Sequence, residues 1–239
     1  MDIHLMGTGG IFTDAMSSFA IVDGNLLLDC PNGAVKTLRR ASYDIKQINT
    51  CLITHFHGDH ILDIPFLLME EGLLSQRQAP FYMIGPRDIR DRVKDLLDIS
   101  YNNLWEKVSE KAMLKVLEID KSSSTFSIDG FDIHAFPVIH EVGEPSYGYT
   151  VASGGKVLGF TGDATICDGV EEILKASDMT ICDMSFELCT ATHMGVDTIL
   201  EYQKQYGDRI IPTHMSDGAR EAYKNAGKVP PKDGSMFYL

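Results

Sequence analysis

Three histidines and one aspartate fall within seven residues, in the stretch THFHGDH. The apolar run CLI precedes it and is typical of a short strand, and period-two alternation puts His55 and His57 on the same side at its end. The glycine after His57 permits a turn that brings Asp59 and His60 toward a second position nearby. Imidazole nitrogen and carboxylate oxygen are donors that zinc and related divalent ions accept. The spacing therefore favours a metal site over a solvated polar loop.

Three further donors follow apolar runs elsewhere in the chain. His140 ends the run FPVIH, Asp163 lies in the turn of GFTGD, and His214 ends IIPTH. Each is followed by small or polar residues, so we expect these side chains at the ends of strands and not within the core. The carboxylate of Asp163 has two oxygens and can bridge two cations about 3.5–4 Å apart. By contrast, we expect His4 and His134, which lie within predicted strands, to be structural.

The elements that position these donors can be predicted from turns and periodicity. Tight-turn residues separate paired apolar runs at three places: Asp23-Gly24-Asn25, Asp129-Gly130 and Ser153-Gly154-Gly155. Helical patterns occupy four stretches: residues 34–42, 87–100, 169–177 and 197–207. Asp168 is a predicted N-cap and Gly207 a predicted C-terminal stop. Strand pairs flanked by helices in both halves indicate an α/β protein whose sheets are covered on their outer faces.

Length and composition limit the class of protein. The 239 residues fit one domain spanning 1–239, in which residues 65–120 form a helical elaboration. A net charge of -13 argues against broad attachment to nucleic acid or to anionic membranes. The chain has no apolar run of ~18 residues and no basic-then-apolar N-terminal pattern, so we expect no membrane span, no signal peptide and a cytoplasmic location. Five cysteines without a C-x-x-C pair indicate free thiols.

On these residues the sequence resembles the metallo-β-lactamase fold hydrolases. HFHGDH matches that family's H-x-H-x-D-H motif, and His140, Asp163 and His214 follow in the family's order. The resemblance covers nearly the whole chain, from HLMGTGG to PTHMSDG. It implies a metallo-β-lactamase-type four-layer αβ/βα sandwich, in which two mixed β-sheets have helices on their outer faces. It also implies that the site lies along one edge, where strand ends meet.

The resemblance also implies a set of metal ligands. Two divalent metal ions are expected, with Zn²⁺ as the first choice and Mn²⁺ or iron as alternatives. The implied ligands of the first ion are His55, His57 and His140. Those of the second are Asp59, His60 and His214. Asp163 is implied to bridge the two ions.

Within this superfamily the sequence is most similar to the ribonuclease Z-like and phosphodiesterase branch. The stretches LMGTGG, PSYGYTV with LGFTGDA, and DMSFELCTATHMGVDTILEY carry that likeness. It implies that His193 lies beside the metals and protonates a leaving oxygen. In a two-metal hydrolytic mechanism, Asp59 or Asp163 is expected to accept a proton from water. Glu187 is a candidate to orient His193. The alternative for His193 is a solvent-facing residue at the start of a helix.

These features favour a metal-dependent hydrolase acting on a small phosphodiester, such as a cyclic nucleotide or a short phosphorylated metabolite. Transfer RNA is disfavoured because the chain is acidic and carries no long basic insertion. Two alternatives remain open: a lactone or thioester hydrolase of the same fold, and a metal-binding or redox protein without hydrolytic turnover. A homodimer formed through residues 65–120 is a further hypothesis.

Overall fold

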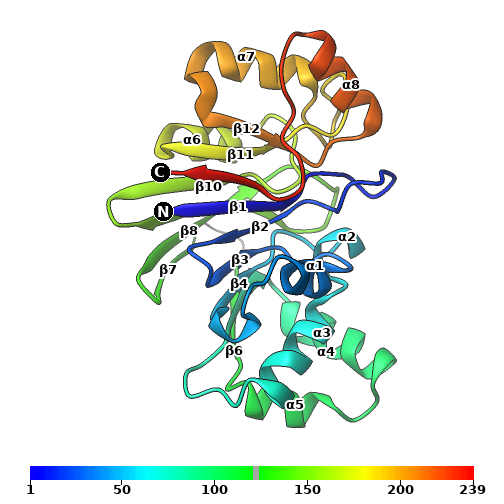
Figure 1. The fold of residues 1–239 in the computed structure, drawn as a ribbon, viewed down its shortest axis with the longest axis vertical. Coiled ribbons are helices and arrows are strands. Elements are labelled where there is room, and N and C mark those ends of the chain that lie inside the picture. The colour runs from blue at the N-terminus through cyan, green and yellow to red at the C-terminus, as the bar shows by residue number, and fades with distance from the viewer. Residues whose placement is uncertain (121–123) are drawn as a thin grey trace.

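Two β-sheets pack face to face, and helices cover the outer side of each sheet (Figure 1). The structure is a computed structural model that describes residues 1–120 and 124–239. Both sheets are mixed, since each contains parallel and antiparallel neighbours. The predicted four-layer αβ/βα sandwich is therefore confirmed.

The first sheet contains seven strands among the described residues, and the termini of the chain lie side by side within it. Its spatial order is β13 (Ser235–Tyr238), β1 (Asp2–Gly7), β2 (Phe19–Val22), β3 (Leu26–Leu28), β4 (Thr50–Leu52), β5 (Tyr82–Pro86) and β6 (Lys115–Ile119). The strands from β13 to β3 pair antiparallel, and those from β3 to β6 pair parallel.

The second sheet contains six strands in the described parts of the chain. Its spatial order is β12 (Ile210–Thr213), β11 (Met179–Asp183), β10 (Lys156–Phe160), β9 (Ser146–Ser153), β8 (Phe131–Val138) and β7 (Ser124–Ile128). Strands β12, β11 and β10 run parallel, whereas β10 to β7 form antiparallel hairpins. The predicted turns at Asp129-Gly130 and at Gly154-Gly155 connect two of these pairs, and both have positive φ at each central residue, as a type I′ turn requires.

The helices divide between the two outer faces (Figure 1). Beside the first sheet lie α1 (Ala34–Arg40), α2 (Gly58–Ile61), α3 (Ile64–Met69), the π-helix η2 (Glu70–Leu74), α4 (Ile89–Ser100) and α5 (Trp105–Lys111), together with the short 3₁₀ turn η1 (Ile45–Gln47). Beside the second lie α6 (Asp168–Ala176), α7 (Val196–Tyr206) and α8 (Asp217–Asn225), with the 3₁₀ turn η3 (Gly207–Arg209). Cys167 is the N-cap residue of α6, so the prediction that Asp168 is the cap is wrong by one residue.

Side-chain alternation along the strands builds the layers. On β3, Leu26 and Leu28 belong to the apolar cluster between the sheets, while Leu27 belongs to the cluster beneath α1, α3, α4 and α5. A third cluster joins the second sheet to α6, α7 and α8. Burying a leucine side chain stabilises a fold by about 1.5–3 kcal/mol, so strands that are apolar on both faces fix the stacking of all four layers.

Residues 65–120, predicted as a helical elaboration, comprise most of α3 together with η2, α4 and α5, and they also contribute β5 and β6 to the first sheet. The parallel register of β4, β5 and β6 explains why helices connect them, because parallel neighbours require a crossover. Across the described residues, no helix combines the length and apolar character needed to cross a bilayer.

Candidate metal centre

The predicted donors lie together at one edge of the sandwich, where strands of both sheets end. His55 follows β4 of the first sheet, and Asp59 lies on the short helix α2 that comes next. His140 follows β8, Asp163 follows β10 and His214 follows β12, all in the second sheet. The site is therefore assembled from both sheets.

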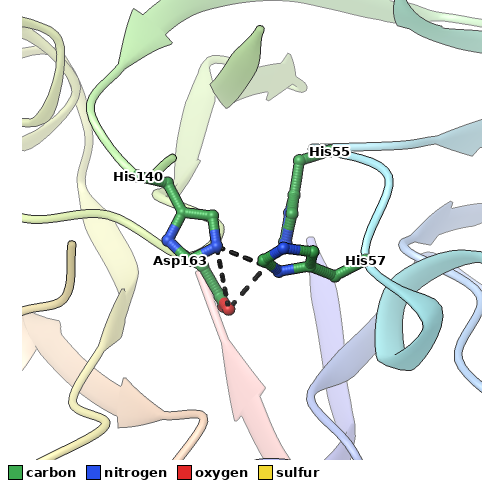
Figure 2. Close-up of side chains that lie close together, drawn as sticks. All are labelled: His55, His57, His140 and Asp163. Carbon is green, nitrogen blue, oxygen red and sulfur yellow. Dashed lines mark hydrogen bonds and ion pairs between the residues drawn. The ribbon is translucent and has the colours of Figure 1, made fainter. Parts of the chain in front are cut away.

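The carboxylate of Asp163 lies at the centre of the cluster. Its Oδ2 lies within 4.0 Å of the Nε2 atoms of four histidines. The individual distances are 3.2 Å to His214, 3.4 Å to His60, 3.9 Å to His55 and 4.0 Å to His140. Figure 2 shows His55 and His57 on one loop and His140 on another, with their rings gathered around this carboxylate. A carboxylate placed between two groups of histidines is the arrangement that a bridging ligand needs.

The donors form separate groups that fit metal ions. One group is His55, His57, His140 and Asp163, and another is Asp59, His60 and His214, with all ligand atoms in each group within 4.8 Å of one another. Donors that bind one ion tetrahedrally at ~2.0–2.2 Å lie about 3.3–3.6 Å from one another, which is within the 4.8 Å limit of each group.

Two buried imidazole nitrogens support the same conclusion. Nε2 of His55 and Nε2 of His60 are buried and have no hydrogen-bond partner. A buried polar atom without a partner is costly, and a cation would satisfy both nitrogens. The residues therefore fit a metal site.

A buried carboxylate, Asp29, orients two of the histidines. The Nδ1–H of His60 donates to Asp29 Oδ2 at 2.8 Å. The Thr54 hydroxyl also donates to Asp29, at 2.9 Å, and accepts from Nδ1–H of His55 at 2.9 Å. With their Nδ1 atoms committed as donors, both rings keep the Nε2 lone pair for the site.

A second buried carboxylate, Asp183, has the matching role on the other side. Nδ1–H of His193 donates to Asp183 Oδ2 at 2.8 Å. The Ser185 hydroxyl donates to Asp183 and accepts from Nδ1–H of His214 at 2.8 Å. Each buried carboxylate thus holds one histidine directly and another through a hydroxyl.

The two remaining histidines are also held at one nitrogen. His140 donates from Nδ1 to the carbonyl oxygen of Thr192 at 3.0 Å. His57 is half-exposed, and its Nε2 lies 3.0 Å from Glu141 Oε2. The free nitrogens, Nε2 of His140 and Nδ1 of His57, lie 3.1 Å apart and face the cluster.

Burial and charge set the protonation of the site. Burial is the main cause that holds the pKa of His55 and of His140 below the ordinary histidine value, so both are neutral imidazoles able to bind a cation. Burial also acts to lower the pKa of His193, but the hydrogen bond and charge of Asp183 outweigh it, and the pKa of His193 is raised. His193 therefore carries its proton to higher pH than an ordinary histidine does.

The backbone at the site adopts two unusual conformations. His214 has φ +56°, which is uncommon for a residue with a Cβ and occurs where the surroundings fix the conformation. Gly162, just before Asp163, has φ +59°, and a Cβ there would come within 2.7 Å of the Thr54 side chain. The Thr-Gly-Asp turn thus needs its glycine both for conformation and for space.

A pocket of about 390 Å³ opens over the cluster. His57, Asp59, Asp163, His193 and His214 line its floor. The other lining residues are Gly10, Ile11, Phe12, Thr13, Ser185, Phe186, Ser216 and Asp217. Among these described lining residues there is no lysine or arginine, so any positive charge would come from histidines or from bound cations.

The structure brings together all seven predicted ligands and His193. Sequence reasoning missed the two carboxylates that orient the histidines. The interpretation that Glu187 orients His193 is wrong, because His193 Nδ1 bonds to Asp183 and Ser185. Asp29 was also missed. Both carboxylates directly follow apolar runs, LLLD and TICD, and that shared pattern is a signal that could have revealed them.

The histidines predicted as structural lie elsewhere. His134 is half-buried on β8 with its ring 4.1 Å from that of Phe136, and His4 on β1 pairs with the hydroxyl of Tyr43. Neither belongs to a group of potential ligands among the described residues.

Curated proteins share sequence with part of this chain. Ribonuclease Z of Agathobacter rectalis is 32% identical over 157 residues, which cover 63% of this chain and 48% of the relative. The chain thus spans about half the length of the curated relatives it matches. These relatives contrast with our expectation that transfer RNA is disfavoured.

Solved structures share the fold over the whole chain. Human tRNase Z, short form, has a TM-score of 0.77 at 22% identity, covering 100% of this chain and 99% of that one. A diphosphatase from the PhnP family has a TM-score of 0.75 at 19% identity, covering 100% and 97%. Zn²⁺-bound PqqB from Methylobacterium extorquens has a TM-score of 0.71 at 15% identity, covering 100% of both chains.

A family model extends the match to almost the full sequence. The model described as Anti-Pycsar protein Apyc1 matches residues 1–230. Together with the two mixed sheets and the His/Asp cluster at their edge, this match shows that the chain belongs to the Anti-Pycsar protein Apyc1 family, within the metallo-β-lactamase fold hydrolases.

Proposed function

We propose that this protein hydrolyses a small phosphodiester, such as a cyclic nucleotide, at the His/Asp cluster. The observation that carries the proposal is that Asp163 lies among the Nε2 atoms of four histidines, on the floor of a pocket that His193 also lines. The names ribonuclease and diphosphatase among its relatives denote enzymes that cleave bonds to phosphorus.

Two divalent cations fit the two groups of donors, and Zn²⁺ is our first choice for both. The first would be held by His55, His57 and His140, the second by Asp59, His60 and His214, and Asp163 would contact both. When bound, such cations supply positive charge that stabilises a developing phosphorane and favours ionisation of water near neutral pH. Neutral His55 and His140 suit this role.

The chain's own side chains supply the proton transfers. Asp59 Oδ2, 3.2 Å from His214 Nε2, lines the pocket and is placed to accept a proton from the attacking water. His193 lines the same pocket with Nδ1 fixed by Asp183, so its Nε2–H is placed to protonate the departing alkoxide. The pKa of His193 is raised by the hydrogen bond and charge of Asp183, so this proton is kept to higher pH than on an ordinary histidine.

Size and charge favour a small substrate. A volume of about 390 Å³ suits a ligand of nucleotide size, since small-molecule pockets span ~300–1,000 Å³. Neither the pocket lining as described nor the net charge of -13 offers the extended basic surface that a folded RNA would contact. We therefore keep transfer RNA as a disfavoured substrate and include it as a test.

The first experiment measures hydrolysis of bis(p-nitrophenyl) phosphate by Zn²⁺- and Mn²⁺-loaded protein, with bound metal counted by elemental analysis. We expect two ions per chain and a rate that His55→Ala abolishes, because that variant removes a donor with no other partner. Cyclic nucleotides and a precursor transfer RNA are then compared. Full metal occupancy with no rate on any of these diesters would refute the proposal.

The variant His193→Ala tests the general-acid role of His193 separately from metal binding. The variant should lose about 10²–10⁴-fold in kcat on diesters with alkyl leaving groups, and little on p-nitrophenyl esters, whose leaving group needs no proton. Equal losses on both substrates would rule out a general acid at this position.

The alternative is a lactone or thioester hydrolase. The apolar side chains of Ile11, Phe12 and Phe186 at the pocket mouth favour it, because they would accept an acyl chain as readily as a base. Turnover of an acyl lactone or thioester by protein that leaves every diester intact would establish this alternative.

A further inference from the structure

Thr165 lies where three segments of the candidate site meet. It is buried in the loop between β10 and α6, two residues after Asp163. Its backbone N–H donates to the carbonyl oxygen of Ile139, the residue before the ligand His140, at 2.9 Å. Its hydroxyl donates to the carbonyl oxygen of Thr190 at 2.6 Å. Thr165 therefore connects the segments of Asp163 and His140 to a third segment, the loop that follows β11.

Within that third segment, residues 190–193 form a turn that is closed on itself. Thr190 N–H donates to the carbonyl oxygen of His193 at 2.8 Å, and His193 N–H donates back to the Thr190 hydroxyl at 3.0 Å. The N–H of Thr192 donates to the same hydroxyl at 3.3 Å. Because these bonds close the turn, a contact that holds Thr190 also holds Thr192 and His193.

The turn contacts a candidate metal ligand and carries the proposed acid. The carbonyl oxygen of Thr192 accepts Nδ1–H of His140 at 3.0 Å, which leaves Nε2 of His140 facing the cluster. His193 belongs to the turn itself, and its ring packs edge-on against the ring of His140 with 4.7 Å between the ring centroids. One short piece of backbone therefore orients both histidines.

The Thr165 hydroxyl is the strongest side-chain donor to this turn from the Asp163 segment. A backbone bond from Met194 N–H to the carbonyl oxygen of Ala164, at 2.8 Å, joins the same two segments just beyond the turn. The thiol of Cys189 also lies 3.6 Å from the Thr190 carbonyl oxygen and 3.4 Å from the Thr165 hydroxyl. A thiol is a weak donor, so the hydroxyl bond at 2.6 Å is the stronger contact.

We infer that Thr165 is a positioning residue, whose hydroxyl holds the turn of residues 190–193 so that His140 presents Nε2 to the first metal ion and His193 keeps its place at the pocket. The part that concerns His193 rests on the proposed phosphodiester activity, whereas the part that concerns His140 is a statement about metal binding. Partners that orient a metal ligand typically change metal affinity or activity 10–100-fold when they are removed. Thr165 acts through the intervening turn, so we expect about tenfold, the low end of that range.

Zinc affinity tests the part that concerns His140. Thr165→Val keeps the branched shape of the side chain and removes the hydroxyl. In a competition titration with a chromogenic chelator, one of the two Zn²⁺ ions should bind about tenfold more weakly and the other as in wild type. Thr165→Ser, which keeps the hydroxyl, should restore the affinity. In a His140→Ala background, Thr165→Val should weaken zinc binding no further, because the ligand through which it acts is gone.

Kinetics at saturating Zn²⁺ test the part that concerns His193. Thr165→Val should lower kcat about tenfold on a diester with an alkyl leaving group and leave KM unchanged, because Thr165 is not among the residues that line the pocket. On p-nitrophenyl esters, whose leaving group needs no proton, kcat should change little.

Thr180→Val is the matched control. Thr180 is a buried threonine on β11 whose hydroxyl has no hydrogen-bond partner among the described residues, so the same substitution removes no bond there. Cys189→Ala is the second control, because it removes the sulfur beside Thr165 and keeps the hydroxyl. Both variants should bind two zinc ions with wild-type affinity and retain wild-type kcat.

Three results would overturn the inference. Unchanged zinc affinity in Thr165→Val would show that the turn holds His140 without the hydroxyl. Equal weakening of both ions, together with a lowered melting temperature, would show that Thr165 supports the fold and not one ligand. An equal loss of kcat on both kinds of ester would refute the link to His193. If wild-type protein hydrolyses no diester, the proposed function fails, and the zinc titration still decides whether Thr165 positions His140.

Discussion

At the scale of single residues, two buried carboxylates outside the pocket lining hold the histidines of the site. Asp29 and Asp183 each accept one histidine N–H directly and a hydroxyl that in turn holds a second histidine. Because the carboxylates fix which ring nitrogen is protonated, they determine which nitrogen has a lone pair for the site. Orienting partners of this kind typically change metal affinity or activity 10–100-fold when removed.

The variant Asp183→Asn should impair the general acid His193 more than it impairs metal binding. The amide lacks the negative charge that raises the pKa of His193, so that pKa should fall and the protonated form should be lost at lower pH. In a pH–rate profile on an alkyl-leaving-group diester, we expect the alkaline limb to move to lower pH, with a loss of about 10–100-fold at neutral pH.

Asp178→Asn is the matched control, because Asp178 accepts the backbone N–H of Val157 at an exposed turn and faces no histidine. A profile that does not move in Asp183→Asn would show that Asp183 does not tune His193.

The sequence allowed us to predict the donor residues at the pocket, but not the residues that orient them through hydrogen bonds. His55 to His60 are recognisable because four donors in one short stretch form a local pattern. Asp29 and Ser185 interact with histidines 31 and 29 residues away, and no local pattern reports such contacts. The wrong choice of Glu187 has the same cause: it lies closer in sequence to His193 than Asp183 does, but its side chain packs against Gly218 of α8.

At the scale of elements, the C-terminal segment positions the loop of Phe12. The carboxylate of Asp233 accepts N–H groups from Thr8 at 2.9 Å and from Met16 at 2.7 Å, which closes the two ends of the loop. Asp233→Ala should lower the free energy of unfolding by about 1–2 kcal/mol and raise KM, because the loop loses its anchor while the metal donors keep theirs.

Urea unfolding and steady-state kinetics would measure both effects. Asp14→Ala on the same loop is the control, since Asp14 is exposed. A raised KM in both variants alike would show that the charge of the loop matters and not its anchoring.

Hairpins and amphipathic helices were the elements that sequence predicted best. Asp-Gly and Gly-Gly turns specify their own backbone geometry, and α4, α6 and α7 lie within two residues of their predicted bounds. Strands β5 and β6 were not predicted from the sequence. Their formation depends on tertiary contacts, because they add to a parallel sheet formed by distant residues. The N-cap of α6 was misplaced because Cys167 caps it without a side-chain hydrogen bond, so no cap signal exists in the sequence.

At the scale of the whole molecule, the candidate site joins the two sheets. One apolar cluster already packs between the sheets, and Tyr149 of β9 donates its hydroxyl to the carbonyl oxygen of Ile53 beyond β4 at 2.6 Å. The donors His55 and His60 come from the first-sheet side, whereas His140, Asp163 and His214 come from the second. Bound cations would therefore tie the edges of both sheets together, which makes metal binding a part of the folding equilibrium.

Metal binding should consequently raise the melting temperature of the whole protein. Ions that bind only the folded state at a hundredfold excess over Kd add about 2.7 kcal/mol, which corresponds to about 5–10 °C for a chain of this size. We expect calorimetry to show this rise with Zn²⁺, its reversal by a chelator, and its loss in His60→Ala. His134→Ala, a histidine on β8 outside the cluster, should retain the full rise. An equal rise in both variants would mean that the stabilising ions bind elsewhere, because His60 Nε2 lies 3.4 Å from Asp163 within the cluster and His134 lies outside it.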